Sequence, residues 1–139
     1  MADLAPYVSD LMLVALANAA NAGTSNPNAV LNLYTGPQPA SPIDGATGIL
    51  LATILLPDPA IAGPNNGDLL LLVAGLTTSV IADGRAAWAR YRTRDNTTVF
   101  DLTVGLTGAG TDIELEVIDL TTSDILNLGN IPLRFQCPN

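Results

Sequence analysis

The sequence contains no histidine and no lysine, and it has a single cysteine, Cys137, among 139 residues. The absence of histidine excludes Ser-His-Asp and Cys-His catalysis, histidine metal ligation and a histidine pH switch. The absence of lysine excludes a Schiff-base amine and a phosphate-loop lysine. One cysteine cannot close an intramolecular disulfide, so Cys137 is expected to pack as a small apolar residue. These absences remove most enzyme chemistries without identifying a function.

Charged residues are also scarce, at 13% of the chain, and 13 acids against five arginines give a formal net charge of −8. Such a chain repels phosphate backbones, so no nucleic-acid partner is predicted. Glu114 and Glu116 alternate along one strand, which indicates a solvated face or salt bridges rather than paired catalytic acids or a calcium loop. We therefore predict no catalytic residue, no metal site, no cofactor and no small-molecule substrate.

Hydrophobic residues make up 48% of the chain, which fits a single domain over residues 1–139 with one core. The start, Met1-Ala2-Asp3-Leu4, carries an acid where a secretory signal would carry bases. The apolar run Leu11–Ala17 is far shorter than the roughly 18 residues that a membrane span needs. The sequence therefore predicts a soluble protein with no membrane partner.

One helix is predicted, from Ser9 as N-cap to Ala22, with Gly23 at the position where helices commonly end. It belongs to an N-terminal arm and helix, residues 1–23, that precedes a β-sandwich over residues 24–139. The helix is expected to pack on the sandwich by an apolar stripe. That stripe consists of Leu11, Val14, Ala15 and Ala19.

After residue 24, turn clusters rich in Gly, Pro and Asn separate short β-branched or alternating runs. This pattern predicts an all-β fold, a jelly-roll-like β-sandwich of about eight short strands behind one N-terminal helix. Strands 48–56 and 69–73 are apolar on both faces and need a second cover, from the helix or from another chain. The strands are expected near 29–35, 48–56, 69–74, 77–82, 86–94, 97–105, 112–118 and 130–137. Pro132 places the last one at a sheet edge, or marks its start.

The best-specified element is a hairpin turning at Asp95-Asn96. A two-residue turn there places Tyr91 opposite Phe100 on an apolar face. The other face is mostly polar, with Arg90 opposite Asp101, Arg92 opposite Val99, Arg94 opposite Thr97 and Trp88 opposite Thr103. A slip by one residue would mix the two faces, so the pattern specifies the register.

All but one of the arginines lie between Arg85 and Arg94. The plain interpretation is a solvated sheet face balanced by local carboxylates. The alternative is a partner contact, in which a basic stripe meets an acidic surface of a partner or of a second copy. The residues of that hypothetical contact are Trp88, Arg90, Arg92 and Arg94.

Four segments carry a resemblance to a known family. Residues 31–42, Leu-Asn-Leu-Tyr-Thr-Gly-Pro-Gln-Pro-Ala-Ser-Pro, and 45–53, Gly-Ala-Thr-Gly-Ile-Leu-Leu-Ala-Thr, resemble the front half of small virion proteins of tailed bacteriophages. Residues 83–90 and 99–105 are similar to the central hairpin of that family. The similarity spans residues 9–120 and is weaker over 121–139. Within the family the chain looks most like head cement, or decoration, proteins of short-tailed phages.

This resemblance implies a jelly roll that binds the outside of the phage head and bridges neighbouring major capsid proteins, with no enzymatic activity. We therefore expect a virion protein on the capsid exterior, soluble in the host cytoplasm before assembly. Its expected partners are the major capsid protein and itself, with a dimer favoured over a trimer. The alternative is a receptor- or glycan-binding β-sandwich module of a phage tail or baseplate. One Trp, three Tyr and two Phe are few for a glycan-binding surface, which favours the cement protein.

Overall fold

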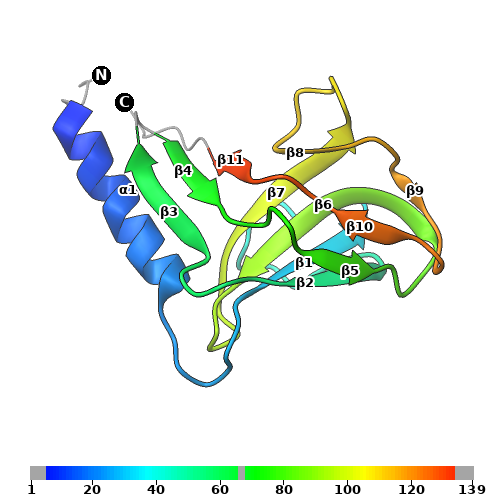
Figure 1. Ribbon diagram of the computed structural model, residues 1–139, viewed down its shortest axis with the longest axis horizontal. Helices are drawn as coiled ribbons and strands as arrows, with labels where there is room; N and C mark the ends of the chain where they lie inside the picture. The colour runs from blue at the N-terminus through cyan, green and yellow to red at the C-terminus, as the bar shows by residue number, and fades with distance from the viewer. Residues whose placement is uncertain (1–5, 66–67, 134–139) are drawn as a thin grey trace.

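The computed structural model describes residues 6–65 and 68–133, in which one helix precedes strands arranged in three sheets (Figure 1). The six-stranded large sheet has the order β2-β1-β6-β7-β8, with β9 paired to β6, and the smaller sheets are β10-β5 and β11-β4-β3. The predicted sandwich-like all-β fold with one N-terminal helix is confirmed. The elements are α1 (Pro6–Asn21), β1 (Val30–Thr35), β2 (Leu50–Leu55), β3 (Ile61–Asn65), β4 (Asp68–Leu71), β5 (Thr77–Ser79), β6 (Gly84–Arg92), β7 (Thr98–Leu106), β8 (Ile113–Leu115), β9 (Asp119–Leu120), β10 (Ile125–Asn127) and β11 (Ile131–Leu133).

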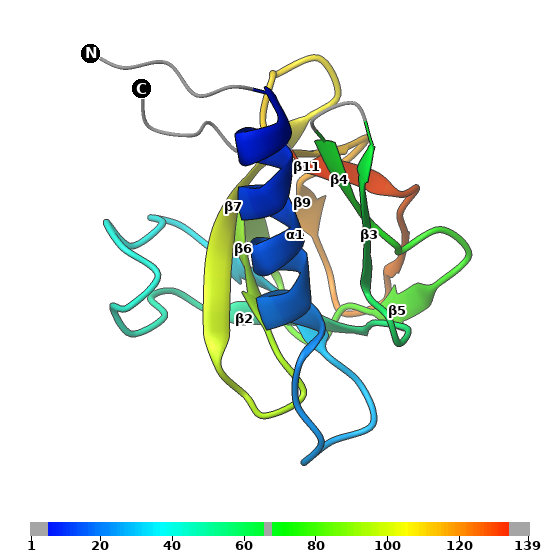
Figure 2. The ribbon, with the colours of Figure 1, turned by 90° about the vertical axis from the view of Figure 1, so that its left-hand side faces the viewer.

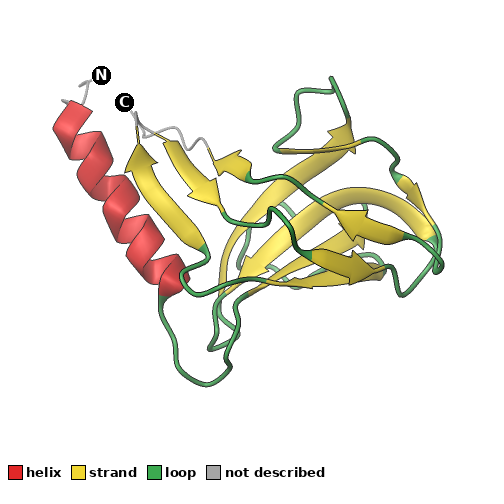
Figure 3. Cartoon of the chain, in the orientation of Figure 1, coloured by secondary structure: helices red, strands yellow, loops and turns green. Residues whose placement is uncertain are grey.

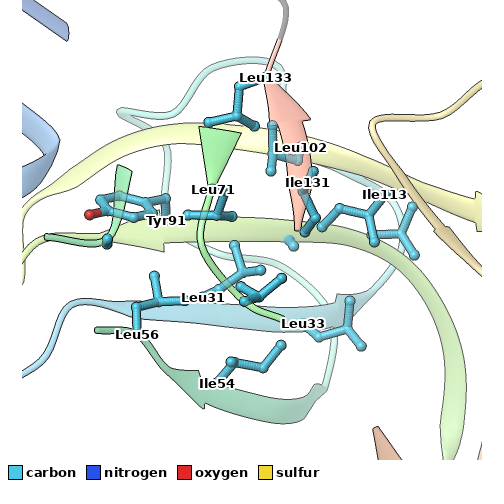
Figure 4. Packing of buried hydrophobic residues seen from close by; sticks show 14 of the residues in the cluster. Leu31, Leu33, Ile54, Leu56, Leu71, Tyr91, Leu102, Ile113, Ile131 and Leu133 are labelled. Carbon is cyan, nitrogen blue, oxygen red and sulfur yellow. The ribbon is translucent and has the colours of Figure 1, made fainter. Parts of the chain in front are cut away.

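The core lies between the large sheet and the two smaller sheets, and α1 lies across one end (Figures 2 and 3). Leu31 and Tyr91 of the large sheet meet Leu71 of β4 and Ile131 of β11 (Figure 4). Each fully buried leucine in such a core contributes about 2 kcal/mol relative to an exposed one. One continuous cluster therefore ties the helix and all three sheets together.

The helix begins at Pro6, three residues before the predicted N-cap, because proline is well suited to the first helical position. Its buried face is also different from the predicted one. Leu13, Ala17 and Ala20 face the core, whereas the stripe of Leu11, Val14, Ala15 and Ala19 is exposed. From residue 11 to residue 20 the only polar residue is Asn18, so hydrophobic periodicity could not specify the rotation of the helix.

The side chain of Asn21 fixes the end of the helix against β3. Its Oδ1 accepts hydrogen bonds from the backbone N–H groups of Ala60 and Ile61, both at 3.0 Å. Its Nδ2 donates to the Ile61 carbonyl at 3.0 Å. These bonds satisfy backbone groups at the strand edge nearest the helix, so the rotation of α1 follows from a polar contact as well as from burial.

The β6–β7 register is confirmed from the Trp88–Thr103 pair to the Tyr91–Phe100 pair. Nearer the turn the prediction is wrong, because Arg92 pairs with Thr98 instead of Val99. The loop contains three residues, 94–96, between Thr93 and Thr97, whose backbone N–H and carbonyl are joined at 2.9 Å. Asn96 has a φ of 65°, and a left-handed residue in third position is typical of this loop type.

The strands predicted to be apolar on both faces are covered differently. Leu69, Leu71 and Val73 are fully buried, because β4 lies between β3 and β11 in a sheet that the helix covers. In contrast, Ile49 and Leu55 at the two ends of β2 are more than half exposed. The second cover therefore comes from the chain itself for β4 and is incomplete for β2.

Three strands were not predicted: β3, β9 and β10. Gly63-Pro64-Asn65 has the composition of a turn, yet it continues β3, whose pairing with β4 becomes irregular there. The strands β9 and β10 contain only two and three residues, too few to show alternation. The edge position predicted for Pro132 is confirmed in β11, while the expected continuation over 134–137, with Cys137, lies outside the described residues.

The Asn21 contact is testable with a matched pair of variants. We expect Asn21→Ala to lower the free energy of unfolding by about 2 kcal/mol, because it leaves half-buried backbone groups without partners. Asn18→Ala, on the exposed side of the same helix, should change it by less than about 0.5 kcal/mol. Urea unfolding followed by circular dichroism measures both values. Equal effects of the two substitutions would contradict the proposed role of Asn21.

From the burial of Tyr91 we predict a loss of stability at alkaline pH. Its hydroxyl donates to the Ala20 carbonyl at 2.7 Å, and burial raises the pKa of Tyr91 to about 12. In the unfolded chain a tyrosine loses its proton near pH 10, so between about pH 10 and 12 only the unfolded state gains by ionisation. The free energy of unfolding should therefore fall through this window, and the fall should be smaller in Tyr91→Phe. Parallel pH dependences of the two proteins in urea unfolding would refute this assignment.

Candidate functional site

The loop of residues 36–49 joins β1 to β2 and projects from the face of the large sheet turned away from β3 and β4 (Figure 2). Its neck closes at Thr35, whose backbone N–H donates to the Ile49 carbonyl at 3.0 Å. The Thr35 Oγ1 in turn accepts from the Ile49 N–H at 2.8 Å. Gly48 has a φ of 84°, and a Cβ there would collide with the Thr35 carbonyl, so this neck requires glycine.

Two aromatic rings support the loop from below. Trp88 is fully buried, and its indole Nε1 donates to the Thr35 carbonyl at 2.9 Å. The ring of Tyr34 stacks on Trp88, with centroids 4.6 Å apart and an interplanar angle of 15°. The neck of the loop is thereby fixed to β6 as well as to β1.

Arg90 links the sheet to the body of the loop. Its guanidinium binds Asp101 through two hydrogen bonds, Nε to Oδ1 at 2.7 Å and Nη2 to Oδ2 at 3.0 Å. Its Nη1 donates to the Asp44 carbonyl in the loop at 2.8 Å, and its Cζ lies 5.2 Å from the centroid of the Trp88 ring. The hydrogen bonds to Asp101 raise the pKa of Arg90 above its ordinary value, although burial acts in the opposite direction. We call Tyr34, Trp88, Arg90 and Asp101 the loop clamp.

The loop clamp corrects the predicted partner contact. Trp88 and Arg90, expected on a solvated face, are 0% and 4% exposed, because the loop folds over that face of the sheet. Arg92 and Arg94 are half-buried. The predicted partner contact is therefore wrong for Trp88 and Arg90. For Arg92 and Arg94 it stays a prediction.

The described arginines are largely neutralised within the chain. Besides the Arg90–Asp101 pair, Arg85 pairs with Asp119 at 2.8 Å and Arg94 pairs with Asp58 at 3.1 Å. Among the described arginines, only Arg92 has a side chain without a hydrogen-bond or ion-pair partner, and its Nε is buried without one. The basic stripe expected from the sequence is thus reduced to one unpaired arginine.

The loop exposes large apolar side chains. Ile43 is 92% exposed, the highest value among the large hydrophobic side chains that the structure describes, and Ile49 at the neck is 54% exposed. We call Ile43 and Ile49 the loop surface. Sequence reasoning missed Ile43, although a Pro-rich connection of this length between two strands is itself a signal, because long loops in compact proteins commonly carry function. Ile49 lies in the segment 48–56, for which a second cover was expected.

The loop clamp predicts unequal costs for two similar substitutions. Asp101→Asn removes one charge of a buried pair and should lower the free energy of unfolding by about 3 kcal/mol. Asp119→Asn removes the carboxylate of the exposed Arg85 pair and should have a much smaller effect, because solvent screens that pair. Urea unfolding gives both values, and hydrogen exchange of residues 36–49 should accelerate only in Asp101→Asn. A stable Asp101→Asn protein with a protected loop would contradict the clamp.

Other kinds of site have less support in the described residues. In the part of the chain that the structure describes, no three Cys, Asp or Glu side chains gather as metal ligands would. The helix found within residues 6–65 and 68–133 is too short to cross a membrane. Comparisons with models of protein families, with curated proteins and with solved structures found no match.

Proposed function

We propose that this chain is a non-enzymatic structural protein of a phage virion, a cement protein that binds the outside of the head and bridges neighbouring major capsid proteins. The observation that carries the proposal is Ile43, which is almost fully exposed in a loop held by a buried ion pair and stacked rings. An isolated apolar side chain on a rigid projection is suited to a pocket on another protein.

The energetics support a role through many copies. Burial of one isoleucine contributes about 2 kcal/mol, which is weak for a single contact. The loop clamp reduces the entropy that the loop would lose on binding. Repeated contacts on a symmetric shell multiply such weak interactions into stable attachment, which is the property a cement protein needs.

The resemblance to virion proteins coincides with this site. The similar segments 31–42 and 45–53 contain most of β1, most of the loop and part of β2, and residues 83–90 end at Arg90 of the loop clamp. Ile43 and Asp44 lie between the two segments, so the similarity covers the neck of the loop and the loop clamp but not Ile43 itself. This agreement supports the capsid assignment over an unrelated binding role.

The glycan-binding alternative has less support. Glycan-binding surfaces commonly present aromatic rings to the sugar, and the four aromatic side chains that the structure describes are all buried. They are Tyr34, Trp88, Tyr91 and Phe100. The major capsid protein is thus the proposed partner, and self-association as a dimer stays a prediction.

The test uses particles produced without this chain, to which purified variants are added. We expect the unmodified protein to decorate the heads at high copy number in electron microscopy. Ile43→Ser should weaken binding in cosedimentation by about 10-fold, in line with the loss of one buried isoleucine. Ile81→Ser is the matched control, because Ile81 is also well exposed, at 61%, but lies outside the loop.

Two outcomes would overturn the proposal. A copy number of a few per virion would exclude a cement role. Equal binding by Ile43→Ser and the unmodified protein would exclude the loop as the contact.

A further inference from the structure

A second surface lies away from the loop, between β8 on one side and β10 and β11 on the other (Figure 1). An open groove separates these segments, in two adjoining parts of about 540 and 570 Å³. Glu114, Leu128 and Gly129 line both parts, so they form one continuous groove. On one side the groove follows the whole segment from Gly110 to Val117. A groove of this length suits an extended chain better than a compact small molecule.

The groove is bordered by strands at the ends of their sheets. The large sheet ends at β8, β11 ends the three-stranded sheet, and β10 pairs only with β5. In the parallel β7–β8 ladder, the Leu115 carbonyl accepts from the Thr107 N–H at 2.9 Å and so points to β7. Because alternate residues of a strand direct their backbone groups to opposite sides, Glu114 directs its N–H and C=O away from β7. Neither group has a partner among the described residues.

The part of the opposite border formed by β11 is protected against such pairing. Pro132 lies in β11 and lines the groove, and its missing N–H removes a donor from that edge. The Asn130 side chain is occupied by the N–H groups of Val73 and Ala74. An incoming strand would therefore pair with β8 and use β10 and β11 as a wall.

The charge of the groove is one-sided. None of its described lining residues is basic, and four of them are acidic: Asp112, Glu114, Glu116 and Asp124. The hydrogen bonds recorded for these carboxylates come from neutral donors, such as the Thr103 hydroxyl and the Gly108 N–H. This differs from Asp58, Asp101 and Asp119, each of which pairs with an arginine. The exposed side chains of Val117 and Ile125 add an apolar part to the lining.

We propose that the groove binds an extended, basic segment of a partner protein, which adds to the large sheet as a strand beside β8. The backbone of the segment pairs with Glu114, its Lys or Arg side chains pair with the groove carboxylates, and its apolar side chains contact Val117 and Ile125. The positive charge comes from a different protein, because this chain has no lysine and pairs most of its described arginines internally. This inference does not depend on the capsid assignment, which rests on the loop surface.

The probe is a fluorescein-labelled peptide of alternating Lys and Val, measured by fluorescence anisotropy at low salt against the full chain. We expect it to bind about 10-fold more tightly than a Glu-Val peptide of the same length. A Lys-Val peptide with N-methyl groups on alternate residues cannot pair along one edge, and it should bind about 5-fold more weakly than the unmodified peptide.

The double variant Glu114→Gln, Glu116→Gln should weaken binding of the Lys-Val peptide by about 5-fold, the effect of losing two exposed charge pairs. The matched control, Asp83→Asn with Asp95→Asn, removes the same charge outside the groove and should change binding by less than about 2-fold. Equal losses in both double variants would show attraction by net charge alone and would overturn the proposal.

Hydrogen exchange on the unsubstituted protein provides a readout that needs no variant. Addition of the Lys-Val peptide should slow exchange of the Glu114 amide, while the amide of Leu115, already paired with β7, should change little. Unchanged exchange at Glu114 with saturating peptide would refute strand addition, and so would equal binding of the N-methyl peptide. A basic peptide that protects the loop 36–49 instead would place the basic partner on the other surface and would also refute it.

Discussion

The buried pair of Arg90 and Asp101 is the interaction on which the proposed binding loop depends. Removing two charges from water is costly, and the cost is offset only when the geometry is good and the remaining donors are used. Here both conditions hold, because the pair is bidentate and the third guanidinium nitrogen binds the Asp44 carbonyl. Apolar burial is non-directional, whereas this contact specifies one position of the loop over the sheet.

Pairing with arginine distinguishes two sets of acidic residues. Asp58, Asp101 and Asp119 each hold an arginine, and the pairs of Asp58 and Asp119 join segments that are distant in sequence. The carboxylates of the groove have no cationic partner among the described residues. Four carboxylates without an arginine partner thus lie together at the seam between the sheets, whereas the loop surface is apolar. The two surfaces suit partners of different chemistry.

Alternation along single strands was enough to predict most strands and the β6–β7 register from Trp88 to Tyr91, because an apolar face defines its own pairing. Alternation did not predict burial correctly where a third segment covers the face of a strand pair. The polar face with Trp88 and Arg90 appeared solvated because no pattern within the hairpin shows that residues 36–49 cover it. The buried face of the helix was predicted wrongly for a related reason. An almost wholly apolar helix is oriented by Asn21 and by small residues at the contact, not by a hydrophobic stripe. Ile43 was missed because a single isoleucine in a loop shows no hydrophobic periodicity.

The contacts that hold the loop join residues far apart in the chain, and this has a consequence for the order of assembly. Asp44 and Arg90 are 46 positions apart, and Thr35 and Trp88 are 53 positions apart. A chain in which β1 and β2 have formed but β6 has not lacks the clamp, so only the neck bonds between Thr35 and Ile49 hold its loop. The fully held loop therefore requires completion of the large sheet. If the loop attaches the chain to a partner, as proposed, incomplete chains do not compete with finished molecules for the partner sites.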